Sequence, residues 1–138
     1  MTIQVTPEVQ AAYNKSLDTR ANAYAPYSKF QVGAAVKFKD FDQVFYGCNV
    51  ENASYGATIC AERNAIWGAV ASIGKQNLEY LIVTTDQEEP APPCALCLQV
   101  LSEFYDPEMP IYLANLQGIQ SQLLLKDILP IPFNSFEV

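Results

Sequence analysis

The chain has 138 residues, half of them hydrophobic, and its 15 acidic residues outnumber the 8 basic ones, for a net charge of −7. This length and composition predict one ordered globular domain over residues 1–138 and exclude a disordered chain. The negative charge disfavours binding to a nucleic acid polymer, and no run is long and apolar enough to cross a bilayer. The first residues lack the features of a secretory signal, so the cytoplasm is the expected location.

The predicted elements alternate between helices and strands, which is typical of an α/β domain. Thr6 is the expected N-cap of a first helix that starts at Pro7, because apolar residues follow at every fourth position. Residues 30–38 alternate as a β-strand, a turn follows at 39–42, and 44–48 is the partner strand of a hairpin. Further along the chain we expect a helix over 58–73, a buried strand over 81–85, a helix over 95–105 and a strand over 111–114.

Two short segments at predicted helix starts carry the candidate chemistry, Cys60-Ala61-Glu62 and Pro93-Cys94-Ala95-Leu96-Cys97. A catalytic zinc ion is held by three protein ligands and keeps an open position for water, and helix N-termini stabilise thiolate sulfur. Histidine is absent from the chain, so any zinc must be bound by cysteine. We therefore predict one zinc ion with Glu62 as the catalytic carboxylate and with three ligands: Cys60, Cys94 and Cys97.

Other interpretations of these residues stay open from the sequence. A lone Cys-x-x-Cys pair is also typical of a redox dithiol, although Cys60 and Glu62 favour zinc. A four-cysteine structural site would need Cys48, whose separation from Cys60 does not fit a zinc knuckle. Cys48 ends an apolar strand and is expected to be a buried free thiol. Glu62 also fits the preference of helix dipoles for an acidic residue in the first turn.

Arg63 is a candidate partner of the metal ligands. Three thiolates carry one more negative charge than Zn²⁺ neutralises, which makes a bound water less acidic. Arg63 directly follows Glu62 in the sequence. We predict that its guanidinium donates hydrogen bonds to ligand sulfurs and withdraws negative charge from them.

Four further segments match one family in the same order along the chain: YSKFQVGAA (27–35), GCNVENASYG (47–56), QVLSEF (99–104) and LPIPF (129–133). Together with the two cysteine motifs, they make the chain resemble the cytidine deaminases of the small homotetrameric class, from about Thr6 to Phe133. The resemblance implies a three-layer α-β-α sandwich around a mixed five-stranded sheet, with one zinc ion per subunit. It implies hydrolytic deamination of cytidine and deoxycytidine to uridine and deoxyuridine, a step of pyrimidine salvage, with Glu62 as the proton shuttle.

The resemblance also assigns contacts to a free nucleoside substrate. Asn49 and Glu51 would hydrogen-bond the ribose hydroxyls, and Phe30 and the backbone amide of Ala61 would contact the base. These assignments have ordinary alternatives, because Phe30 also fits the apolar face of its strand. Asn49 and Glu51 also fit a polar turn.

Self-association follows from the same resemblance. Tyr55 and Phe133 would reach into a neighbouring subunit's site, so a homotetramer with shared active sites is expected. The chain departs from the family pattern at Ala95, where glycine is usual, and at Leu98, where arginine is usual. It also lacks the usual Gly-Pro after Phe133.

Two alternatives to cytidine deamination stay open. Within enzymes, the substrate is instead a related aminonucleoside such as blasticidin S. Outside enzymes, the chain is a zinc-stabilised nucleoside-binding or structural domain. Glu62 disfavours this second alternative, because a purely structural zinc site does not need the carboxylate.

Overall fold

The computed structural model describes residues 3–136, and a five-stranded sheet with the order β2-β1-β3-β4-β5 lies at its centre. β3 and β4 run parallel, whereas every other neighbouring pair is antiparallel. The sheet is therefore mixed, as expected. Its strands are β1 (Gly33–Phe38), β2 (Val44–Cys48), β3 (Leu78–Thr84), β4 (Pro110–Asn115) and β5 (Gly118–Leu124).

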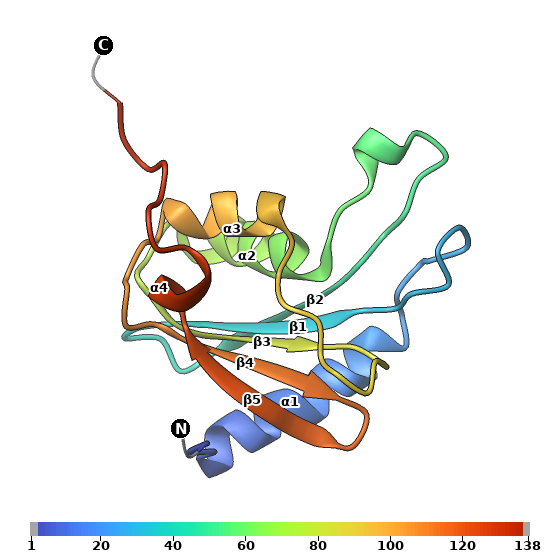
Figure 1. The fold of residues 1–138 in the computed structure, drawn as a ribbon, viewed down its shortest axis with the longest axis horizontal. Coiled ribbons are helices and arrows are strands. Elements are labelled where there is room, and N and C mark those ends of the chain that lie inside the picture. The colour runs from blue at the N-terminus through green and yellow to red at the C-terminus, as the bar shows by residue number, and fades with distance from the viewer. Residues whose placement is uncertain (1–2, 137–138) are drawn as a thin grey trace.

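Helices cover both faces of this sheet, which confirms the three-layer sandwich (Figure 1). One helix, α1, lies on one face, and α2 and α3 lie side by side on the other. Within residues 3–136, no helix is long and apolar enough to span a membrane. The helical elements are α1 (Pro7–Arg20), a 3₁₀ turn η1 (Tyr55–Ala57), α2 (Ala61–Ile73), α3 (Ala95–Ser102) and α4 (Leu125–Ile128).

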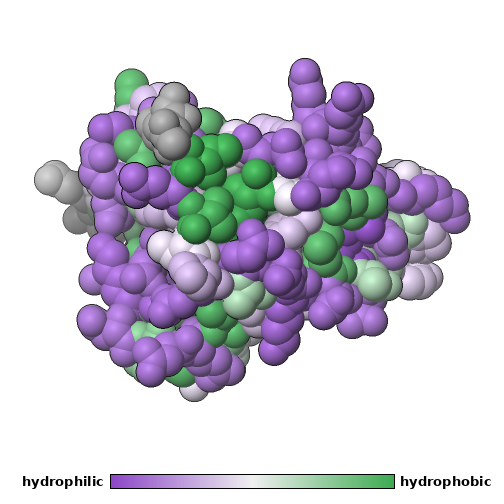
Figure 2. All heavy atoms as spheres, turned by 90° about the horizontal axis from the view of Figure 1, so that it is seen from below, coloured by the Kyte–Doolittle hydropathy of each residue, from purple (hydrophilic) through white to green (hydrophobic). Residues whose placement is uncertain are grey.

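The sequence explains why α1 forms and where it packs. Thr6 caps the helix by accepting a hydrogen bond from the Val9 amide at 3.2 Å, and Pro7 occupies the first helical position. Val9 and Tyr13 point into the sheet, where the Tyr13 hydroxyl donates to the Asn115 carbonyl at 2.7 Å. Seen from the side of α1, most of the surface is hydrophilic, around a central hydrophobic patch (Figure 2).

The larger core lies on the opposite face, between the sheet and α2 and α3. Gly47 of β2 lets α2 approach closely, because a Cβ at this position would lie 2.5 Å from both the Ala61 carbonyl and the Ala65 amide. This contact fixes the N-terminus of α2 against the sheet. Large side chains that are fully buried in this core include Phe38, Ile66, Leu81, Leu101 and Ile111.

Some element boundaries differ from the prediction. The helix expected from residue 58 begins at Ala61, because Ile59 and Val50 exchange backbone hydrogen bonds of 3.0 Å and keep the chain extended. Cys60 is therefore the N-cap rather than a residue of the first turn. The strand expected from residue 30 begins at Gly33, and the helix expected to reach residue 105 ends at Ser102.

Candidate metal centre and active site

Two helix N-termini bring three cysteines together. Cys60 is the N-cap of α2, Cys94 is the N-cap of α3, and Cys97 lies in the first turn of α3. Their sulfur atoms all lie within 4.8 Å of one another, and the Cys60 and Cys94 sulfurs are 3.7 Å apart. Three converging sulfur ligands in a chain without histidine fit zinc, a metal that thiolates bind well. The sequence prediction of a zinc site is confirmed. Cys48 is outside this cluster and is a half-buried free thiol rather than a fully buried one.

The charge around the cluster favours a thiolate at Cys60. The Cys97 thiol and the Arg63 guanidinium hydrogen-bond to the Cys60 sulfur and lower the pKa of Cys60 to about 5. The Arg63 Nη2 atom lies 3.3 Å from this sulfur. This is the contact that the net negative charge of three thiolates and Zn²⁺ predicted. The hydrogen bond to Cys60 and burial together raise the pKa of Cys97. Metal binding requires thiolates, and these contacts favour the thiolate form of Cys60.

Glu62 is a buried carboxyl group directly beside the cysteines. Its side chain is in the first turn of α2, the residue is 5% exposed, and its Oε2 atom is 3.6 Å from the Cys97 sulfur. Burial, with a further contribution from the Cys60 thiolate, raises the pKa of Glu62 to about 7. A carboxyl group with a pKa near neutrality both accepts and returns protons. Glu62 therefore has the chemistry of a general acid and base.

A cleft of about 300 Å³ opens onto this centre. It brings together four of the residues expected to contact substrate, which come from distant parts of the chain. Val83 and Thr85, at the end of β3, form another part of the wall. The predicted residues that line the cleft are Phe30, Asn49, Glu51, Cys60, Ala61, Glu62 and Cys94.

Asn49 is buried and lines the cleft, and it also has a structural task in this wall. Its Oδ1 atom accepts a hydrogen bond from the Val32 amide at 2.8 Å, and its Nδ2 atom donates to the Phe30 carbonyl at 2.7 Å. Because an amide nitrogen carries two protons, one donor of Asn49 stays available. The Asn49 side chain thus fixes the backbone of residues 30–32, which leads into β1.

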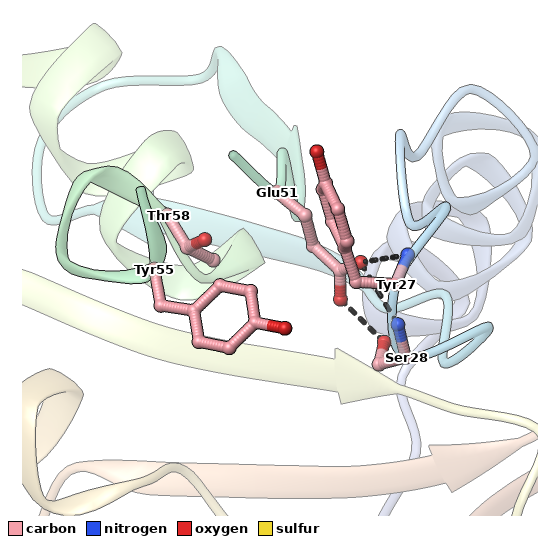
Figure 3. A pocket seen from close by; sticks show the side chains of 5 residues that line it. All are labelled: Tyr27, Ser28, Glu51, Tyr55 and Thr58. Atoms are coloured by element: carbon pink, nitrogen blue, oxygen red, sulfur yellow. Dashed lines mark hydrogen bonds between the residues drawn. The ribbon is translucent and has the colours of Figure 1, made fainter. Parts of the chain in front are cut away.

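Tyr55 and Phe133 do not line this cleft. Tyr55 is 74% exposed on η1 and borders an adjoining hollow of about 390 Å³ (Figure 3), where its ring centroid lies 5.9 Å from that of Tyr27. Phe133 is 66% exposed, and its carbonyl accepts a hydrogen bond from the Gln99 side chain at 2.8 Å. The tail is thus held against α3 while the Phe133 ring stacks on Phe136.

Some lining residues were missed in the sequence. Ser28 and Thr58 border both the cleft and the adjoining hollow, and Thr85 and Pro92 line the cleft. Thr85 follows a buried strand, and the carboxyl end of a strand is a common place for a ligand site, so this signal was present.

Leu98, which stands where the family usually has arginine, is partly buried against the core, so this departure adds to the packing of α3.

Comparison with known proteins agrees with this geometry. Residues 7–113 match the family model described as the cytidine and deoxycytidylate deaminase zinc-binding region. The chain is 40% identical to a cytidine deaminase of Halalkalibacterium halodurans over 91% of this chain and 94% of the relative. It is 41% identical to a cytidine deaminase of Sporosarcina psychrophila over 92% of each chain.

A solved structure extends the similarity to the fold. The crystal structure of cytidine deaminase from Burkholderia pseudomallei superposes with a TM-score of 0.83, with 40% identity over 94% of this chain and all of the other. The family model covers most of the chain, and both relatives match over nearly their full lengths. The chain therefore belongs to the cytidine and deoxycytidylate deaminase family defined by this zinc-binding region.

Proposed function

We propose that the protein is a zinc-dependent hydrolase that converts cytidine and deoxycytidine to uridine and deoxyuridine and releases ammonia. The observation that carries the proposal is the position of Glu62, a buried carboxyl group beside three converging cysteine sulfurs at the base of a cleft. A structural zinc site has no use for such a carboxyl group. The names of the relatives support the same reaction.

Cys60, Cys94 and Cys97 would hold the zinc ion, which when bound supplies Lewis-acid activation of a water molecule. Glu62 would take a proton from that water and deliver it to N3 of the pyrimidine as the water oxygen adds to C4. Glu62 would then move the second water proton to the exocyclic amine, so that the C4–N bond breaks and ammonia leaves. The pKa of about 7 suits a group that carries protons in both directions.

The cleft wall supports a free nucleoside as substrate. Phe30 would pack against the flat base, and the Ala61 backbone amide would donate to it. Asn49 offers one amide proton and Glu51 offers a carboxylate oxygen to ribose hydroxyls. The net charge of −7 disfavours a nucleic acid polymer, which supports the free nucleoside and a role in pyrimidine salvage.

We further propose a homotetramer of single-domain subunits (1–138) in the cytoplasm. The exposed rings of Tyr55 and Phe133 support self-association, since each is available to a neighbouring subunit's cleft. All four cysteines are free, and a reducing compartment keeps such thiols available for zinc.

The test is the change in ultraviolet absorbance as the zinc-loaded protein acts on cytidine, deoxycytidine and blasticidin S. We expect turnover of cytidine and deoxycytidine with a kcat/KM at least tenfold above that for blasticidin S. A preference for blasticidin S would instead assign the related aminonucleoside. Inactivity on all three substrates would contradict the proposed reaction while leaving the zinc site in place.

A further inference from the structure

The carboxylate of Glu51 is held by the loop that precedes β1 (Figure 3). Its Oε1 atom accepts hydrogen bonds from the backbone amides of Tyr27, at 2.9 Å, and of Ser28, at 3.0 Å. The Ser28 hydroxyl donates to the other oxygen, Oε2. Three donors from two adjacent residues therefore fix both the position and the rotation of this carboxylate.

The Ser28 hydroxyl also connects Glu51 to the residue expected to contact the base. Its oxygen accepts a hydrogen bond from the Phe30 amide at 3.0 Å. The loop bends sharply between these residues, with Lys29 at φ 62° and its amide bonded to the Ala25 carbonyl at 3.0 Å. One hydroxyl group thus sets the distance between the Glu51 carboxylate and the backbone of Phe30.

The remaining hydrogen-bonding capacity of Glu51 is small. A carboxylate has about four acceptor positions, and the three loop donors fill three of them. The position left on Oε2 suits one hydroxyl donor. These hydrogen bonds from Ser28 lower the pKa of Glu51, so the carboxylate is ionised and acts purely as an acceptor. Ser28 and Glu51 both line the cleft that contains Glu62.

We infer that Ser28 is a positioning residue that aims the last acceptor position of Glu51 at a single hydroxyl of the substrate's sugar. The inference rests on the proposed function, since it needs a sugar in the cleft. Ser28 acts through Glu51 in this account. It has no part in moving protons, which is the proposed task of Glu62 in the same cleft.

The experiment combines uridine binding with cytidine kinetics on the zinc-loaded protein. Calorimetry gives the Kd of uridine for the wild type, Ser28→Ala, Glu51→Gln and the double variant, and melting temperature and zinc content verify that each is folded. Ser54→Ala is the matched control, because Ser54 lies in the neighbouring loop and its side chain makes no capping hydrogen bond to η1. Turnover of cytidine separates KM from kcat in each variant.

We expect Ser28→Ala to weaken uridine binding and raise KM by about 5- to 20-fold, since it removes a hydrogen bond to a charged group. The kcat should stay within about twofold, because the Glu62 environment is unchanged. In the Glu51→Gln background, loss of the Ser28 hydroxyl should add little, because the two residues act as one unit. Ser54→Ala should match the wild type.

Two results would overturn the inference while leaving the proposed function intact. One is a Ser28→Ala protein that binds uridine as tightly as Ser54→Ala does. The other is a double variant whose loss equals the product of the two single losses, which would show that Ser28 does not act through Glu51. A wild type that neither binds uridine nor turns over cytidine contradicts the proposed function, and the inference falls with it.

Discussion

Arg63 places a positive charge directly against a metal-binding sulfur. Its guanidinium lies 3.3 Å from the Cys60 sulfur, and its planar group sits over the Trp67 ring with 5.8 Å to the ring centroid. Together with the hydrogen bond from Cys97, this interaction lowers the pKa of Cys60, and it raises the pKa of Arg63. At the scale of single residues, Arg63 therefore places one positive charge against the Cys60 sulfur, as the predicted compensation of the one net negative charge of three thiolates and Zn²⁺ requires.

Replacing Arg63 with glutamine should weaken zinc binding by about 10- to 100-fold, the usual cost of losing a partner that orients a metal ligand. Competition with a chromogenic chelator measures the affinity. Lys126→Gln is the matched control, because it also removes one positive charge but from an exposed ion pair with Glu108. Equal zinc affinities for the two variants would show that Arg63 does not tune the cluster.

The sequence predicted the residues whose roles depend on short spacings. Cys60 and Glu62, and Cys94 and Cys97, are two or three residues apart, so local helix geometry brings each pair together. Ser28 was missed as an individual residue because its role depends on Glu51, which is 23 positions away in the chain. Such a contact depends on how two loops meet, and no local pattern encodes it.

At the scale of elements, the position of α2 depends on its contact with β2. Gly47 has no space for a side chain, since a Cβ there would meet the backbone of Ala61 and Ala65 at 2.5 Å. Backbone atoms cannot move aside as flexible side chains do. The helix that carries Glu62, with Cys60 as its cap, would have to shift away from the sheet.

Gly47→Ala should lower the free energy of unfolding by about 1–3 kcal/mol, the usual cost of overpacking, and should also weaken zinc binding. Gly68→Ala is its counterpart on the exposed face of α2, where an added Cβ meets nothing. This second change should stabilise the protein by about 0.5–1 kcal/mol, because alanine favours the helix. Urea unfolding measures both. A Gly47→Ala protein as stable as the wild type would contradict the close contact.

Patterning predicted four of the five strands and missed the fifth. The β2 boundaries agree with the prediction, and β4 was expected within one residue at each end. Patterning missed β5 because Gln120, Ser121 and Gln122 interrupt its apolar pattern on an edge of the sheet, and the resemblance implied a fifth strand without locating it. Tertiary pairing with β4, rather than local propensity, makes this segment a strand.

At the scale of the whole molecule, the described chain leaves large aromatic rings exposed near the cleft and on the tail. Tyr55 and Phe133 are both mostly exposed, and Tyr27 and, on α2, Trp67 are each about half exposed. Burying such rings is a main source of association energy between subunits. The resemblance and these rings together predict a tetramer whose subunits complete one another's sites.

Phe133→Ala should raise KM for cytidine or lower kcat by about tenfold, because in the proposed tetramer the variant removes a ring from a neighbouring subunit's site. Steady-state kinetics and sedimentation equilibrium measure activity and assembly on the same preparation. Ile131→Ala, which changes another exposed apolar residue of the tail, is the control. Unchanged kinetics in Phe133→Ala would show that the sites are not shared through this residue.

The most direct measurement of the central claim compares cytidine turnover by the wild type and by Glu62→Gln at equal zinc content. Glutamine keeps the shape of the side chain but cannot carry a proton, so we expect loss of turnover by at least about 10²-fold with zinc still bound. Turnover by Glu62→Gln at the wild-type rate would contradict the account, because the buried carboxyl group beside the cysteines would then have no part in the reaction.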